Sequence, residues 1–89
     1  MHPNEVKSLI EAGLTDAEVL VEGDGSHFTA LVISPAFTGK SRLQNQQRVY
    51  HTVNAQLMDG SLHALSIKTL TPEEWIKLKQ NKEENSWKD

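Results

Sequence analysis

The first apolar pattern of the chain has the period of a helix. Residues 4–13 place Val6, Leu9 and Ile10 on one helical face, and Gly13 is a residue type that commonly ends helices. Asn4 or a neighbour is expected to cap the start of this helix. The pattern predicts an amphipathic helix that buries one face.

The next pattern predicts a pair of strands. Two β-rich runs, residues 18–22 and 27–34, flank the segment GDGS. An Asp-Gly turn between such runs predicts an antiparallel hairpin. The second run carries apolar residues at both parities, Phe28 and Val32 at one and Leu31 at the other, so it is expected to be a central strand covered on both faces.

The second half of the chain predicts two more helices and one more strand. Pro35 and Gly39 mark SPAFTGKS as a loop. A helix is expected over residues 41–58, with a stripe of apolar residues and a Gln-, Asn- and Arg-rich opposite face. The stripe consists of Leu43, Tyr50, Val53 and Leu57.

Residues 62–69 then predict the third strand. The segment TPEEW places Thr71 as N-cap, Pro72 at the first helical position and Glu74 three residues after the cap. This is a capping box, and it predicts a final helix from Pro72 to about Lys79.

The predicted order is α-β-β-α-β-α, in one small α+β domain over residues 1–80 with a mixed three-stranded sheet. The strands 27–34 and 62–69 are joined through a helix, so they are expected to be parallel. Residues 81–89 are polar and are expected to fray as a tail. The predicted core consists of Val6, Leu9, Ile10, Phe28, Val32, Leu43, Val53, Leu57, Leu65, Ile67 and Trp75.

Composition narrows the class of protein. The chain has 89 residues, no cysteine and a formal net charge of −3. A dedicated nucleic-acid binder usually has a basic excess, because phosphate contacts supply most of its affinity. The apolar runs are shorter than the roughly 20 residues of a membrane span, and the N-terminus does not resemble a signal peptide. We therefore expect a soluble cytoplasmic protein.

Two histidines stand at the starts of two strands that are expected to be parallel. His27 opens the strand 27–34, and His63 lies at the start of the strand 62–69. Parallel strands begin at the same edge of a sheet, and neighbours lie about 4.8 Å apart. Two explanations are open. Each histidine is a solvated residue at the end of a strand, or the two imidazoles together form a half-site for a metal centre that a partner completes.

Other candidate groups carry weaker signals. His51 is expected on a helix surface, and Ser26 beside His27 does not by itself create a nucleophile and base. No paired carboxylates, catalytic triad or cofactor fingerprint stands out. We therefore expect no enzymatic activity.

Two longer segments resemble a known family. FTGKSRLQNQQRVY followed by LHALSIKTLTPEEW resembles the BolA family, and GDGSHF before the second strand is most similar to its IbaG (YrbA) branch. The resemblance covers roughly residues 5–78. It implies a fold similar to a class II KH domain.

The resemblance also implies a partner and a cofactor. Members of the family pair with monothiol, CGFS-type glutaredoxins and share a bridging [2Fe–2S] cluster with the glutaredoxin cysteine and glutathione. The C-terminal histidine of the family falls on His63, and the second ligand position matches His27. The apo protein is expected to fold, alone as a monomer or weak homodimer, because its predicted core is complete without metal.

A second interpretation is DNA binding in transcriptional regulation, which is described for some BolA-like proteins. Lys40, Arg42, Arg48 and Lys68 would form a modest basic patch near the second predicted helix. The Gly-x-x-Gly backbone clamp of KH domains is missing, because FTGKSR contains only one glycine. A solvated charged face is the alternative explanation for these four residues.

Overall fold

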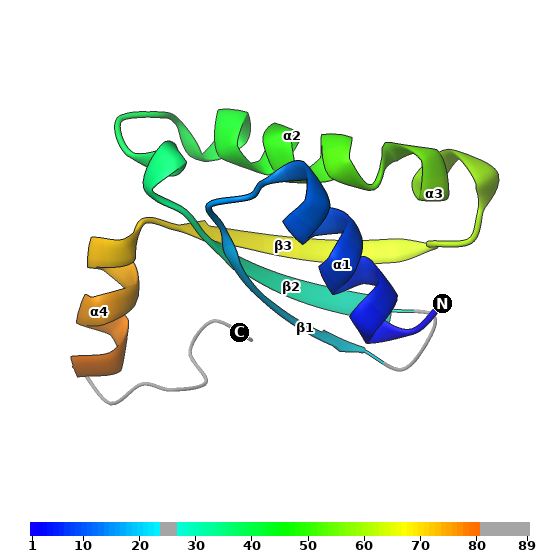
Figure 1. The fold of residues 1–89 in the computed structure, drawn as a ribbon, viewed down its shortest axis with the longest axis horizontal. Helices are drawn as coiled ribbons and strands as arrows, with labels where there is room; N and C mark the ends of the chain where they lie inside the picture. Colours follow the sequence, from blue (N-terminus) through cyan, green and yellow to red (C-terminus); the bar gives the residue numbers. More distant parts are fainter. Residues whose placement is uncertain (24–26, 81–89) are drawn as a thin grey trace.

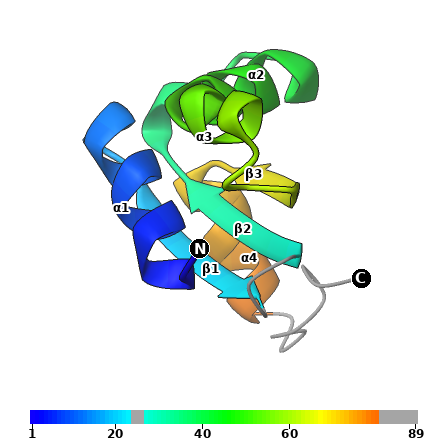
Figure 2. The same cartoon turned by 90° about the vertical axis from the view of Figure 1, so that its right-hand side faces the viewer.

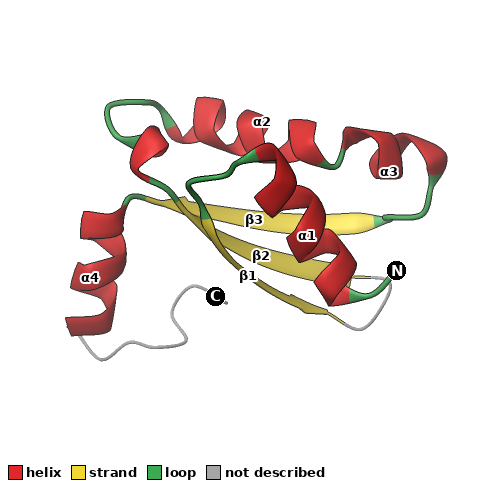
Figure 3. Ribbon diagram, in the orientation of Figure 1, coloured by secondary structure: helices red, strands yellow, loops and turns green. Residues whose placement is uncertain are grey.

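The computed structural model describes residues 1–23 and 27–80. Its elements in chain order are α1 Pro3–Gly13, β1 Glu18–Gly23, β2 His27–Ile33, the 3₁₀ helix η1 Pro35–Phe37, α2 Arg42–Thr52, α3 Asn54–Asp59, β3 Ala64–Leu70 and α4 Pro72–Gln80 (Figures 1 and 3). Most of the predicted GDGS turn and the whole tail 81–89 lie outside the described residues.

The strands form one mixed sheet in the order β1-β2-β3. β1 pairs antiparallel with β2, and β2 pairs parallel with β3. The parallel pair is connected through η1, α2 and α3. The predicted α+β class, the hairpin and the parallel crossover are therefore confirmed.

Both faces of the sheet are covered, by different helices. α1 and α2 lie over one face, and α4 lies against the other (Figure 2). Phe28 and Val32 of β2 belong to the larger core under α1 and α2, whereas Leu31 and Ile33 belong to a smaller core with Leu70. β2 is thus the central strand that its apolar residues at both parities predicted.

The start of α1 differs from the expectation. His2 is the N-cap, because its Nδ1 atom accepts a hydrogen bond of 3.1 Å from the backbone N–H of Asn4. The Glu5 carboxylate accepts one of 2.8 Å from the backbone N–H of His2. The prediction that Asn4 or its neighbour caps the helix was therefore wrong, and a histidine takes the place of the usual Ser, Thr, Asp or Asn.

The long helix predicted over residues 41–58 is broken. Val53 has φ −118° and ψ 15°, and it separates α2 from α3. The Thr52 hydroxyl donates a 2.6 Å hydrogen bond to the carbonyl of Val49 just before this break. Val53 itself is fully buried, so core packing holds the irregular backbone in place.

The face that α2 buries also differs from the predicted stripe. Leu43 is 64% exposed, whereas Asn45, Val49 and Val53, spaced by four residues, are buried. Leu43 was therefore wrongly placed in the core. The reason is that α2 runs beside the edge strand β3, so the face it turns inward depends on the sheet and not on the apolar residues of the helix alone.

Two α2 side chains bond to the backbone of β3. Tyr50 Oη donates a 3.0 Å hydrogen bond to the carbonyl of Leu65, and Gln46 Nε2 donates one of 3.3 Å to the carbonyl of Ile67. These donors are four residues apart on the helix, and the acceptors are two apart on the strand. The spacing of the donors along the helix therefore matches the spacing of the acceptors along the strand. These bonds satisfy carbonyl groups of an edge strand that could otherwise pair with a strand of another molecule.

The segment predicted as a loop contains additional order. η1 begins after Ser34, whose side chain accepts a 3.1 Å hydrogen bond from the backbone N–H of Ala36. Phe37 at the end of η1 is only 2% exposed and joins the larger core. No helix in the described part of the chain has the length and apolar character needed to cross a membrane.

Candidate functional site

The two candidate ligands His27 and His63 lie at the same end of the sheet. The parallel register pairs His27 with Ala64, the first residue of β3, and His63 is the residue immediately before it. Paired strands lie about 4.8 Å apart, so one residue and one strand spacing separate the two backbones. Both histidines are exposed, at the end of the sheet opposite α4 (Figure 1).

The alternation of side chains does not place the two histidines on one face. Residues at the parity of His27, such as Leu31, pack toward α4, whereas residues at the parity of His63, such as Leu65, pack toward α1 and α2. Strand parity therefore directs the two imidazoles to opposite faces of the sheet. What the two residues share is the end of the sheet.

His63 follows a turn with a dense set of hydrogen bonds. Asp59 Oδ1 accepts from the Ser61 hydroxyl at 2.6 Å and from the Ser61 backbone N–H at 2.8 Å. These bonds, the side-chain one first, hold the pKa of the Asp59 carboxyl below its usual value. Leu62, next to His63, is 1% exposed, and its N–H donates to the carbonyl of Gln56. The backbone that leads into His63 is thus fixed by hydrogen bonding and burial.

The histidine pair does not form a complete metal site by itself. Across residues 1–23 and 27–80, no three His, Asp or Glu side chains are grouped closely enough to hold a metal ion. The chain contains no cysteine. Within the described residues, the two imidazoles therefore make an open half-site, which further ligands would have to complete.

His51 lies elsewhere. It is exposed in the last turn of α2 and lines a shallow pocket with Gly13, Leu14 and Arg48, between α1 and α2. Ser26 lies outside the described residues. His51 is therefore a suitable control for experiments on the other two histidines.

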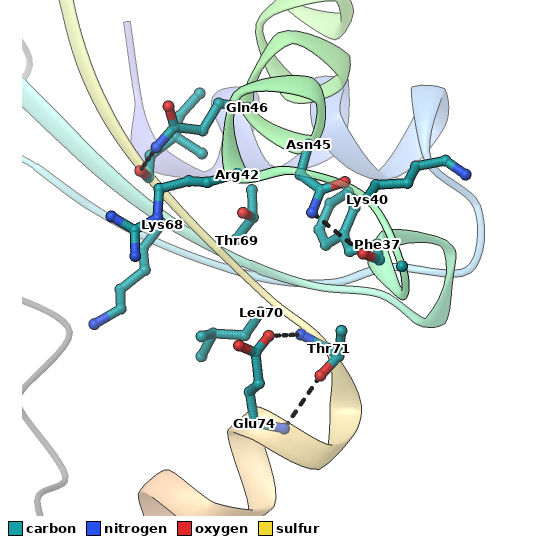
Figure 4. A pocket seen from close by; sticks show the side chains of 12 residues that line it. Phe37, Lys40, Arg42, Asn45, Gln46, Lys68, Thr69, Leu70, Thr71 and Glu74 are labelled. Atoms are coloured by element: carbon teal, nitrogen blue, oxygen red, sulfur yellow. Dashed lines mark hydrogen bonds between the residues drawn. The ribbon is translucent and has the colours of Figure 1, made fainter.

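The four basic residues proposed for nucleic-acid binding fall into two places. Lys40, Arg42 and Lys68 line one pocket, of about 630 Å³, between η1, the start of α2, the end of β3 and the start of α4 (Figure 4). Arg48 lines the pocket beside His51 instead. A helix turns about 100° per residue, so Arg48 lies on a different face of α2 from Arg42.

The wall of this basic pocket includes a buried amide that the sequence did not single out. Asn45 is 6% exposed, and its Nδ2 donates a 3.3 Å hydrogen bond to the carbonyl of Phe37. Its Oδ1 is buried with no hydrogen-bond partner among the described residues. Leaving such an acceptor unsatisfied costs about 1–3 kcal/mol. Asn45 sits in the polar run LQNQQR, where its neighbours give no signal that this one amide is buried.

Comparison with known proteins decides the family. A family model described as BolA-like protein matches residues 6–74. The chain belongs to the BolA family. It is 42% identical over 77 residues to the acid stress protein IbaG of Escherichia coli K12, covering 86% of this chain and 92% of that relative.

Other members of the BolA family agree with this assignment. A solved structure of a BolA homologue from Coxiella burnetii superposes with a TM-score of 0.77 at 39% identity, covering 85% of this chain and 97% of that one. The DNA-binding transcriptional regulator BolA of Haemophilus influenzae is 40% identical over 53 residues, which is 60% of this chain and 50% of that protein. The resemblance noted in FTGKSRLQNQQRVY and LHALSIKTLTPEEW is thus confirmed at the level of the family.

Proposed function

We propose that this BolA-family chain is a partner of a monothiol, CGFS-type glutaredoxin and contributes histidine ligands to a [2Fe–2S] cluster shared between the two proteins. His63 is the main ligand and His27 the second. The observation that supports the proposal is the parallel register, which pairs His27 with Ala64 and so brings the backbones of His27 and His63 to the same end of the sheet. The role is the handling of clusters, in trafficking or in the regulation of iron and stress responses, and not catalysis.

The donor set of the chain fits such a cluster. Histidine replaces cysteine on one iron of some [2Fe–2S] centres, so imidazole nitrogens are suitable ligands. This chain offers two exposed imidazoles and no thiol. The glutaredoxin cysteine and glutathione would supply the thiolates, which is consistent with the reducing cytoplasm that we propose as its compartment.

The half-site stands on a core that needs no metal. Fifteen hydrophobic residues are buried in the described part of the chain, and neither histidine is among them. Loss of the cluster should therefore leave the domain folded. In this respect the chain differs from small metal-dependent domains, which unfold when their ion is removed.

Reconstitution tests the proposal. The protein is mixed with a monothiol glutaredoxin, iron, sulfide and glutathione, and visible absorption and circular dichroism are recorded against the glutaredoxin alone. A cluster with a histidine ligand should give a spectrum different from that of the all-thiolate cluster. Spectra equal to the sum of the separate components, with no co-elution of the two proteins, would rule the proposal out.

DNA binding is the second candidate function. It is favoured by the name of the Haemophilus influenzae relative and by the gathering of Lys40, Arg42 and Lys68. The position of Arg48 on another face of α2 speaks against a continuous basic track. Titration with a DNA duplex at two salt concentrations tests it, because phosphate contacts are strongest at low salt and binding should then be detected.

A further inference from the structure

The geometry points to a second site, the basic pocket between α2, β3 and α4, which we infer binds the phosphate group of a small organic phosphate monoester. The site is about five residues along β3 from His63, or about 16 Å at the strand rise of about 3.3 Å per residue. It is therefore separate from the proposed cluster site, and neither proposal depends on the other.

Two cations lie together in this pocket, and neither forms an ion pair with a described residue. Arg42 extends from the start of α2 and Lys68 from β3, and their side chains run toward the same side of the pocket, whereas the Lys40 side chain points toward the opposite side (Figure 4). None of these three side chains forms an ion pair with a described residue. Like charges held side by side repel, so this arrangement favours the binding of an anion.

The start of α2 adds to the positive potential. Arg42 is the first residue of α2, and the first turn of this helix has no acidic residue. α1 has Glu5 in its first turn, and α4 has Glu73 and Glu74. An N-terminal helix end carries partial positive charge, so a cation there is unfavourable for the helix and favourable for an anion bound nearby.

The charge of the pocket matches a doubly charged anion. Three cationic side chains and one carboxylate, that of Glu74, line it, which leaves an excess of two positive charges. Glu74 is already engaged, since its Oε1 accepts a 2.8 Å hydrogen bond from the backbone N–H of Thr71. A phosphate monoester carries about −1.5 to −2 charges at neutral pH, whereas a carboxylate carries one.

The pocket has room for more than the phosphate. Its volume of about 630 Å³ falls within the usual range of small-molecule sites. The hydroxyl groups of Thr69 and Thr71 are polar groups on the lining, and they suit hydrogen bonds to an organic part that carries hydroxyl or amino groups.

The same geometry argues against a nucleic-acid backbone as the occupant. A polymer needs cations spaced along a track, to meet successive phosphates. Here three of the four candidate cations line one pocket, with Arg42 and Lys68 directed toward the same side of it, and Arg48 lines another pocket (Figure 4). Two cations on the same side of one pocket suit a single phosphate group.

Titration of the full chain by ¹⁵N–¹H NMR tests the inference, with inorganic phosphate, adenosine monophosphate and adenosine as probes at constant ionic strength. We expect adenosine monophosphate to cause saturable shifts of the amides of Lys40, Arg42 and Thr69. Inorganic phosphate should shift the signals of the same amides but bind more weakly, and adenosine should shift none of them. Equal shifts with adenosine and adenosine monophosphate, or shifts that do not saturate, would overturn the inference.

Matched variants make the test specific. Arg42→Gln and Lys68→Gln should each weaken binding by about tenfold, the usual effect of losing a charge-assisted hydrogen bond. Lys77→Gln removes the same charge from an exposed position on α4 that does not line the pocket, and it should bind as the unaltered chain does. Equal weakening by Lys77→Gln would show a non-specific charge effect and refute the site.

A titration with a DNA duplex distinguishes a small phosphate monoester from a nucleic-acid backbone as the occupant. One result is that DNA, at the same phosphate concentration, binds more tightly than adenosine monophosphate, and that Arg48→Gln weakens DNA binding as much as Arg42→Gln does. In that case a nucleic-acid backbone is the occupant, and the pocket proposal fails. If Arg48→Gln has no effect on either probe, the single-phosphate pocket is supported.

Discussion

The Tyr50 hydroxyl donates a 3.0 Å hydrogen bond to the backbone carbonyl of Leu65, so a side chain of α2 satisfies a polar group of the edge strand β3. Replacing Tyr50 with Phe keeps the ring and removes only this donor. The free energy of unfolding should fall by about 1 kcal/mol, the typical net value of one such bond. Chemical denaturation measures the change.

Gly23 lies where the hairpin approaches His27. A Cβ atom at Gly23 would lie 2.5 Å from the His27 carbonyl oxygen and 2.5 Å from Cδ1 of Phe28. Gly23→Ala should therefore destabilise the protein by roughly 1–3 kcal/mol and move the backbone of His27. Thermal unfolding and the amide shift of His27 measure the two effects.

Gly39→Ala is the matched control for this substitution. A Cβ atom there meets nothing within 4 Å, although its φ of +77° makes the change unfavourable for the backbone. It should destabilise the protein without altering the His27 signal or cluster assembly. If Gly23→Ala left the His27 signal unchanged, the close approach would not be positioning that histidine.

The capping box of α4 provides a test of structure without function. Glu74 N–H donates a 3.2 Å hydrogen bond to the Thr71 hydroxyl, and Thr71→Ala removes that acceptor. We expect a loss of about 1 kcal/mol in stability and unchanged binding to a glutaredoxin. Loss of partner binding at full stability would mean that Thr71 has a direct role in the interface.

The histidine assignments are tested together. His63→Ala should keep the fold, since the side chain is exposed, but the mixed cluster should be lost or acquire a thiolate-like spectrum. His27→Ala should have a milder effect in the same direction. Cluster binding should also weaken in acidic solution, because a protonated imidazole nitrogen cannot act as a ligand.

His51→Ala is the control, because His51 is an exposed histidine on another part of the molecule. It should leave both the absorption and the circular dichroism of the mixed cluster unchanged. A mixed cluster that survives His63→Ala but disappears with His51→Ala would contradict the assignment of ligands to the end of the sheet.

Acid should weaken the turn before His63. Hydrogen bonds from Ser61 lower the pKa of Asp59 in the folded state below its usual value of 3.8. The stability that this carboxylate contributes is therefore present above 3.8 and lost as the pH falls through the lowered value. Asp59→Asn should reduce stability at neutral pH, and its difference from the unaltered chain should shrink in strong acid. A difference independent of pH in denaturation experiments would exclude this linkage.

Local chemistry decided much of this fold, and the sequence therefore predicts it. The Thr71–Glu74 capping box depends on residues three apart, and Gly60 adopts the positive φ of 83° that ends α3. The apolar residues at both parities of 27–34 determined that β2 is central, because only a strand covered twice can bury them. The family-specific segments are likewise readable without coordinates.

Other features arise from contacts between residues far apart, and only the tertiary structure decided them. Leu43 is exposed and Asn45 is buried because β3 and η1 fix which face of α2 turns inward. Periodicity gives the spacing of a helix face but not its direction.

The gathering of Arg42 and Lys68 depends on the same long-range packing of α2 against β3. The sequence alone could name His27 and His63 as strand-end residues. Their common position at one end of the sheet follows from the register of β2 and β3, two strands that pair across more than thirty residues of chain. The two faces of this sheet bury side chains of opposite parity.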